Sequence, residues 1–199
     1  MSYRTDAAVN CLEVVGRVVN VFTRNDKKIM TVYSRNHMND VYLYVELADE
    51  KAPLNHHQAV SIKAHVDGYW YEDKETGKRK NVQHFVADQI SNARTCVESA
   101  FGVKGKFVEE LALTYFIKGT LRGIKEDHGY LRLDIETLSG AQKKHSHVRV
   151  SMKVPERDIG VKVGDNICCV CDVNSKNREV SGKERHFEDI LVRDIGKVG

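Results

Sequence analysis

The feature that most constrains the fold is an internal repeat: the same series of short β-type segments occurs in both halves of the chain. The first half contains five runs rich in Val, Ile and Tyr, separated by polar turns, at 11–22, 29–34, 41–47, 60–71 and 82–90. The second half contains five more, at 113–124, 130–137, 147–154, 166–173 and 186–195. A repeat of about 100 residues indicates two copies of one small domain.

The two series align with each other along most of their length. In the first run of each, VVGRV at 14–18 aligns with IKGTL at 117–121. The fourth runs align at 60–64 and 165–169, and the closing runs at 83–86 and 185–188, then at 88–90 and 193–195. The predicted domains are therefore 1–92 and 112–199, joined by a partly helical linker at 93–111.

Each half carries an insert between its third and fourth runs, at 48–58 and at 155–164, with room for a loop or one short helix. Five strands with an insert at this place are the pattern of the OB-fold, a small Greek-key barrel. A glycine in the long first strand, Gly16, suits the sharp bend that this strand makes. We therefore predict an all-β protein of two tandem five-stranded OB-fold barrels with short helical inserts.

Composition narrows the class of protein. The chain is 41% hydrophobic and 30% charged, which is enough to build a core and unlike a disordered chain. No apolar run approaches the roughly 20 residues that cross a membrane, and the first residues lack a signal-peptide stretch. The five cysteines are odd in number and lack the paired spacing of a zinc site. These features predict a cytoplasmic protein with reduced thiols, no membrane partner and no metal.

The net charge and the lack of catalytic motifs in the sequence favour a binding function over an enzymatic one. The net charge of +3 permits a nucleic-acid partner without demanding one. The chain contains no phosphate-binding P-loop, no His-Glu-x-x-His pair and no Gly-x-Ser-x-Gly nucleophile elbow. Its acidic residues are scattered, without the cluster that two-metal nuclease chemistry needs. We predict a protein that is not an enzyme and needs no cofactor.

Alternation along the strands assigns side chains to faces, because neighbouring residues of a strand point to opposite sides. Residues 41, 43, 45 and 47 form one apolar set that fills the barrel. The outer face of the first three strands then gathers aromatic and basic side chains, namely Arg17, Thr31, Tyr33, Arg35, Tyr42 and Tyr44. OB-folds bind oligonucleotides across strands 2–3, and aromatic rings stack on unpaired bases. The alternative is that these tyrosines cover a neighbouring domain or a dimer interface.

The second half presents a less aromatic outer face, typical of phosphate contacts, with Arg122, Tyr130, Arg132 and Arg149. The first half adds Lys63 and an aromatic strand that leads into a basic hairpin, with Trp70, Lys78, Arg79 and Lys80. These side chains complete the predicted nucleic-acid site. The alternatives are a solvated charged face and, for Trp70, an anchor for the hairpin or an interface.

A family resemblance appears in the first half. Asn10 with the segments 14–18, 29–35 and 60–64 resembles the corresponding strands of bacterial single-stranded DNA-binding proteins. The resemblance covers about residues 10–90 directly and 112–195 through the internal repeat. It implies single-stranded DNA binding with little sequence preference, protecting or organising the strand in replication, recombination or transfer. The acidic tail ending in Pro-Phe that the family carries does not match residues 195–199, which suggests a specialised paralogue of a phage or mobile element.

The expected partner is single-stranded DNA, and RNA stays open because stacking does not distinguish the sugars. A homo-oligomer and contacts with replication or recombination proteins also stay open. The alternative function is an OB-fold module for protein–protein interaction or oligomerisation. Salt separates the two functions, because nucleic-acid binding weakens steeply as salt rises.

Overall fold

The computed structural model describes residues 9–36, 39–48, 55, 58–93, 111–140, 143–156, 158–180 and 182–198. Ten strands lie in this part of the chain: β1 (Val9–Arg24), β2 (Lys27–Arg35), β3 (Asp40–Leu47), β4 (Ala59–Glu72), β5 (Arg79–Asn92), β6 (Ala112–Asp127), β7 (Tyr130–Ser139), β8 (Lys144–Lys153), β9 (Asn166–Val180) and β10 (Lys183–Lys197). No helix among the described residues is long and apolar enough to span a bilayer.

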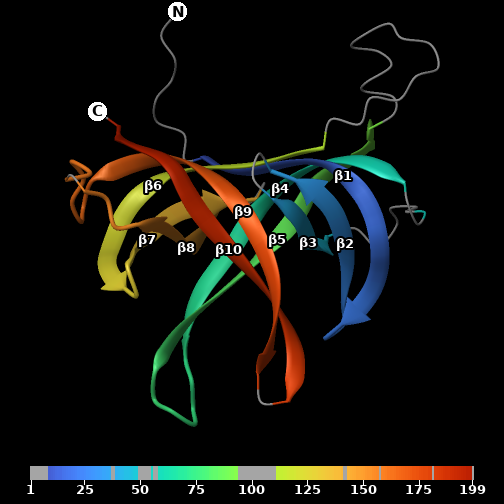
Figure 1. The fold of residues 1–199 in the computed structure, drawn as a ribbon, viewed down its shortest axis with the longest axis horizontal. Coiled ribbons are helices and arrows are strands. Elements are labelled where there is room, and N and C mark those ends of the chain that lie inside the picture. The colour runs from blue at the N-terminus through green and yellow to red at the C-terminus, as the bar shows by residue number, and fades with distance from the viewer. Residues whose placement is uncertain are drawn as a thin grey trace, which may run out of the picture.

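Strand pairing divides the sheet into two sets of five. In the first set the order is β1-β2-β3-β5-β4, and β4 pairs again with β1. In the second set the order is β6-β7-β8-β10-β9, and β9 pairs again with β6. The β3–β5 and β8–β10 pairs are parallel. The all-β prediction is confirmed, and the pairing is consistent with two tandem OB-folds (Figure 1).

One antiparallel pairing joins the two sets. Strand β1 runs beside β6 from Val9, opposite Lys118, to Val15, opposite Ala112. The long β4–β5 and β9–β10 hairpins both project to the same side of this joining sheet (Figure 1). Each hairpin therefore lies close to the other set of strands as well as its own.

The core follows the predicted alternation. Val41, Leu43 and Val45 are fully buried, and so are their counterparts in the second set, such as Val150. Thr31, which the alternation assigns to the outer face together with Tyr44, is nevertheless only 8% exposed. Thr31 lies between Asn20 on one side and Tyr44 on the other, so larger neighbours cover its short side chain.

The predicted glycine bend in the first strand is present in both sets. A Cβ added to Gly16 would lie 2.5 Å from the backbone oxygen of Tyr33 in the neighbouring strand β2. A Cβ added to Gly119 would meet the backbone oxygen of Glu136 in the same way. Only glycine permits this close approach of two strands.

Strand registers correct part of the predicted repeat alignment. Gly16 lies opposite Val60 and Gly119 lies opposite Ile167, so the fourth strands are displaced by two residues from their predicted match. In the fifth strands both bulges fall at matching positions, after Ala87 in β5 and after Val192 in β10. The match of 88–90 with 193–195 is thereby supported. The predicted match of 83–86 with 185–188 is wrong by three residues, because the bulges place Gln83 at the position of Glu188.

The prediction of short helical inserts is wrong for the second insert. Its described residues, 155–156 and 158–164, form bends and turns instead of a helix. Gly160 and Gly164 have φ angles of 68° and 97°, which interrupt any helix there. Most of the first insert, and residues 94–110 of the predicted helical linker, lie outside the described residues.

Candidate nucleic-acid interface

The predicted tyrosine face is present on β2 and β3. The rings of Tyr33 and Tyr42 lie 5.4 Å apart at a tilt of 49°, and Tyr42 is 48% exposed. Arg17 lies beside them, because it is paired with Tyr33 across β1 and β2. The structure thus brings two rings and one guanidinium-bearing residue together on an open face, which suits stacking with unpaired bases.

Tyr44 belongs to a different environment from Tyr42. Its ring stacks on His186 of β10, with 4.0 Å between the centroids, and lies edge-on to Phe22 at 5.5 Å. Its backbone N–H donates a 2.6 Å hydrogen bond to Oε1 of Glu188. For Tyr44, therefore, the alternative prediction holds, because the second set of strands covers this tyrosine.

The ring of His186 and the carboxyl group of Glu188 are mostly buried, with side chains 10% and 17% exposed. Burial raises the pKa of Glu188, and the nearby His186 ring and the hydrogen bond from the N–H of Tyr44 offset this only in part. Nδ1 of His186 lies 2.8 Å from Oδ1 of Asn177. Its Nε2 lies 3.6 Å from Glu188 and has no closer polar partner.

A reciprocal contact holds the other hairpin against β8. Gln83 of β5 accepts a hydrogen bond from the N–H of Arg149 at 3.0 Å and donates to its carbonyl at 3.3 Å. Ser146 accepts from the N–H of Gly68 at 2.8 Å and donates to the carbonyl of Val66. A Cβ on Gly68 would strike the carbonyl of His147. The two sets of strands are therefore clasped at two related places.

Trp70 anchors this second clasp, as the alternative prediction proposed. The guanidinium of Arg149 lies 4.6 Å from its ring centroid, and that of Arg79 lies 5.0 Å away. Both distances are within the range of cation–π attraction. Trp70 and Arg79 are therefore engaged with protein groups, and less of the ring is open to a base.

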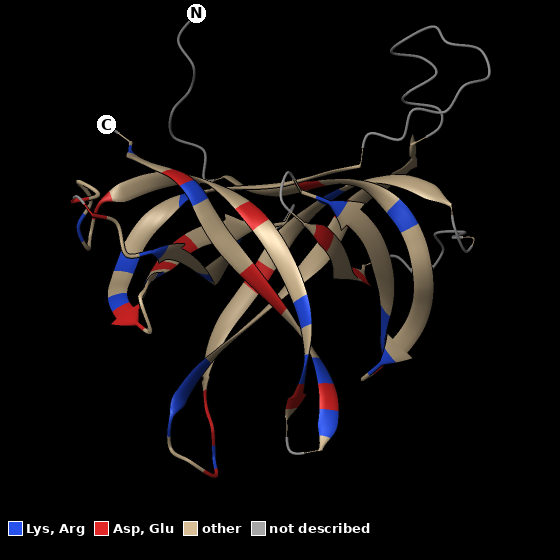
Figure 2. Ribbon diagram, in the orientation of Figure 1, with Lys and Arg blue, Asp and Glu red and all other residues tan. Residues whose placement is uncertain are grey.

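Most of the predicted basic residues have carboxylate partners. Ion pairs join Arg35 to Asp40 at 2.7 Å, Arg122 to Glu136 at 2.5 Å, Arg132 to Asp127 at 2.5 Å, Arg149 to Asp134 at 2.9 Å, and Lys80 to Asp73. The pairing lowers the pKa of Asp40, Asp73 and Glu136. Basic and acidic stretches lie beside each other along both hairpins (Figure 2). These cations attract phosphate less than their number suggests.

Three predicted site residues lie apart from these clusters. Lys63 is opposite Glu13 in the β1–β4 pairing and does not line the hollows described below. Lys78 lies in the turn between β4 and β5. Tyr130 is 39% exposed at the start of β7. Their role in binding stays a prediction.

Two connected hollows lie between the two sets of strands. The larger, of about 900 Å³, is lined by residues of β1–β5 from the first set and of β7, β8 and β10 from the second. The smaller, of about 660 Å³, lies between the end of β1 and the start of β10. They share four lining residues, Arg24, Tyr44, His186 and Phe187.

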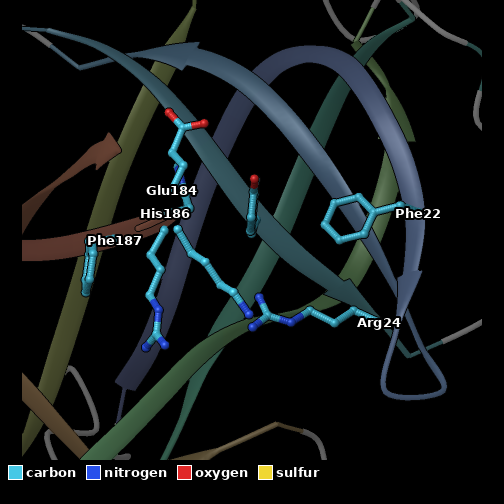
Figure 3. Close-up of a pocket in the computed structure, with 8 residues that line it drawn as sticks. Phe22, Arg24, Glu184, His186 and Phe187 are labelled. Carbon is cyan, nitrogen blue, oxygen red and sulfur yellow. The ribbon is translucent and has the colours of Figure 1, made fainter. Parts of the chain in front are cut away.

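Figure 3 shows Phe22 and Phe187 on opposite sides of the smaller hollow, with Arg24 reaching in from the end of β1. Sequence reasoning missed all three residues. In the sequence, HF at 186–187 indicates only the repeat, and Phe22 only the end of a strand. Their shared place depends on how the two sets of strands dock, for which the sequence offers no local signal.

Within the described part of the chain, no group of three or more His, Cys, Asp or Glu side chains is placed to hold a metal ion. The thiols of Cys169 and Cys171 are buried, and burial raises the pKa of Cys169 to about 12. These two cysteines pack in the core as neutral thiols.

Comparison with known proteins identifies the fold. No family model matches the chain, and no curated protein matches it. Among solved structures, it is similar to the wild-type single-stranded DNA binding protein from Thermus aquaticus, with a TM-score of 0.58 and 11% identity over 97% of this chain and 94% of that one. A deletion mutant of that protein gives a TM-score of 0.57 and 10% identity over 96% and 95%. The chain therefore has the fold of that DNA-binding protein over nearly its whole length, as the resemblance implied.

Proposed function

We propose that this protein binds single-stranded DNA with little sequence preference, through two tandem OB-folds that act together. The observation that carries the proposal is the larger hollow, to which both sets of strands contribute aromatic and basic side chains. Unpaired bases stack on such rings whatever their sequence, and the flanking cations attract the phosphates. The fold shared with the Thermus aquaticus protein supports the same function.

The path that we propose runs from the exposed Tyr33–Tyr42 pair on β2 and β3 towards the hollows beside Tyr44. Tyr42 and Tyr44 lie two residues apart, so their side chains leave the same face of β3. A DNA strand on the tyrosine pair would therefore reach these hollows within a few nucleotides. The protein would hold or protect the strand without transforming it. Replication, recombination or transfer as the pathway, a phage or mobile-element origin, and a cytoplasmic location stay predictions.

The proposal is tested by fluorescence anisotropy with labelled dT oligonucleotides of about 15 and 35 nucleotides at two salt concentrations. The affinity should fall steeply with salt, and the longer strand should bind more tightly because the linked sites raise each other's effective concentration. Duplex DNA and an RNA of the same length serve as competitors. Equal competition by RNA would extend the ligand to both nucleic acids, and no binding at low micromolar protein would refute the proposal.

A further inference from the structure

The two places where a hairpin of one set meets the other set are equivalent in the repeat but differ in chemistry. Counting six residues from the close-approach glycines matches Phe22 with Lys125, and counting eight matches Arg24 with Asp127. The first place is called here the β1–β10 junction. The second, at the end of β6 and the start of β5, is called the β6–β5 junction.

The fifth strands show the same contrast. Counting back from the matching bulges, Phe187 of β10 corresponds to Val82 of β5, and Arg185 corresponds to Lys80. Phe187 is 37% exposed and lines both hollows. The β1–β10 junction thus has aromatic rings at two positions where the β6–β5 junction has a lysine and a valine.

Three cations at the β6–β5 junction are paired with carboxylates, whereas Lys125 forms no ion pair with another described residue. Lys80 is paired with Asp73. Asp127, at the position equivalent to Arg24, is paired with Arg132 at 2.5 Å. Arg149, the counterpart of Tyr44, is paired with Asp134 at 2.9 Å. A phosphate at this junction would have to compete with these carboxylates.

Two arginines at the β1–β10 junction have no such partners, although the neighbouring Lys27 is paired with Glu46 at 2.8 Å. Among the described residues, no carboxylate forms an ion pair with Arg24 or Arg185. Glu184 lines the same hollow, but Figure 3 shows it directed to the opposite end from Arg24. The stacked Tyr44–His186 pair forms one wall, and Phe22 and Phe187 face each other across the space.

We propose that the β1–β10 junction is the main base-binding subsite for single-stranded DNA, and that the β6–β5 junction is a structural clasp. The volume of about 660 Å³ is within the usual range of ligand pockets, about 300–1,000 Å³. An unpaired base stacks on Phe187 or Phe22, and Arg24 and Arg185 contact the adjoining phosphates. The inference rests on the proposed function and names where in the groove binding is concentrated.

Matched substitutions at equivalent positions test the inference on the full chain. With a labelled dT oligonucleotide of about 15 nucleotides, Phe187→Ala should weaken binding about 5- to 150-fold, as the loss of one stacked base does. Val82→Ala, at the equivalent position, should change the affinity by less than about threefold, since no base stacks there. Phe187 is partly exposed, so its loss should leave the thermal midpoint close to that of the unmodified protein.

Salt dependence provides an independent readout of the phosphate contacts. Arg185→Gln should reduce the slope of log affinity against log salt by about 0.7, the value for one phosphate contact on a single strand. Lys80→Gln, its counterpart, should leave the slope unchanged because Asp73 already holds that lysine. Ultraviolet crosslinking of the dT probe should label the peptides that carry Phe22 or Phe187.

The possible results separate the inference from the proposed function. If the unmodified protein does not bind the probe, both are refuted. If it binds with a steep salt dependence but each matched pair loses affinity equally, or Phe187→Ala keeps full affinity, the inference is refuted and the proposed function stands. Crosslinks confined to the peptide of Trp70 would also contradict the inference.

Discussion

Replacing Glu188 by glutamine should make the protein more stable at neutral pH, although it removes a charged hydrogen-bond acceptor. The equivalent position of the repeat already carries Gln83, which makes the same type of contact to Arg149. Glutamine keeps an acceptor for the N–H of Tyr44, which now donates to Oε1 of Glu188 at 2.6 Å. The geometry therefore accommodates the substitution.

The magnitude follows from two opposed effects. A neutral hydrogen bond contributes about 0.5–1.5 kcal/mol and one to a charged group about 1.5–3 kcal/mol, so the contact loses about 1 kcal/mol. Burying an unpaired charge costs several kcal/mol, but the neighbouring His186 and His84 offset part of this cost for the Glu188 side chain, which is 17% exposed. We expect a net gain of about 1 kcal/mol, which is about 2–4 °C in the thermal midpoint for a chain of this size.

The gain should depend on pH in a definite direction. Burial raises the pKa of Glu188 in the folded state. Stability from a group of this kind is fully present below its unfolded pKa, about 4.3, and is lost as the pH rises through the folded pKa. Glu188→Gln should therefore match the unmodified protein at about pH 4 and exceed it above the raised pKa.

Thermal unfolding followed by circular dichroism over this pH range is the assay. The reverse substitution, Gln83→Glu, is the matched control: it should lower the midpoint at neutral pH, because it replaces a donor to the carbonyl of Arg149 with a carboxylate. A loss of stability in Glu188→Gln at neutral pH would refute the reasoning. It would mean that the charged carboxylate is net favourable in its contact with the N–H of Tyr44.

Three further predictions concern the β1–β6 pairing, the β4–β5 hairpin and the exposed tyrosine face. Tyr115→Phe should cost about 1 kcal/mol of unfolding free energy in urea titrations, since its buried hydroxyl donates to Oδ1 of Asn10 at 2.8 Å; a neutral result would mean that this bond adds nothing. Gly68→Ala should lower the thermal midpoint and increase proteolysis of the β4–β5 hairpin, because its Cβ would strike the carbonyl of His147; unchanged proteolysis would contradict this. Tyr42→Ala should weaken binding of a dT oligonucleotide about 5- to 150-fold with little change in stability, and equal affinity would remove Tyr42 from the site.

Much of the fold could be predicted because both the repeat and the strand alternation are local patterns. The inward set Val41, Leu43 and Val45 was assigned correctly from alternation alone. One ion pair could also be predicted from the β7–β8 register, which places Asp134 directly opposite Arg149. Side-chain direction and cross-strand pairing thus follow from sequence wherever neighbouring strands are consecutive.

The contacts between the two sets of strands could not be predicted in this way. Tyr44 and Glu188 are 144 residues apart, and they meet only because β1 pairs with β6 in one particular register. A shift of that register would move both hairpins relative to the opposite set. Phe22 and Phe187 are ordinary strand residues in sequence, and docking alone makes them walls of one hollow.

Covalent linkage of the two copies explains why the two junctions can differ. In a symmetric dimer of a single-domain chain, every interface contact occurs twice, so a change at one junction is a change at both. Here the equivalent positions belong to one chain and vary separately, as Gln83 and Glu188 illustrate at the clasps. One junction can then carry ion pairs that hold the two sets together, while the other carries aromatic rings and unpaired arginines for a ligand. A DNA strand bound across such a surface contacts two different halves. It therefore has a preferred direction.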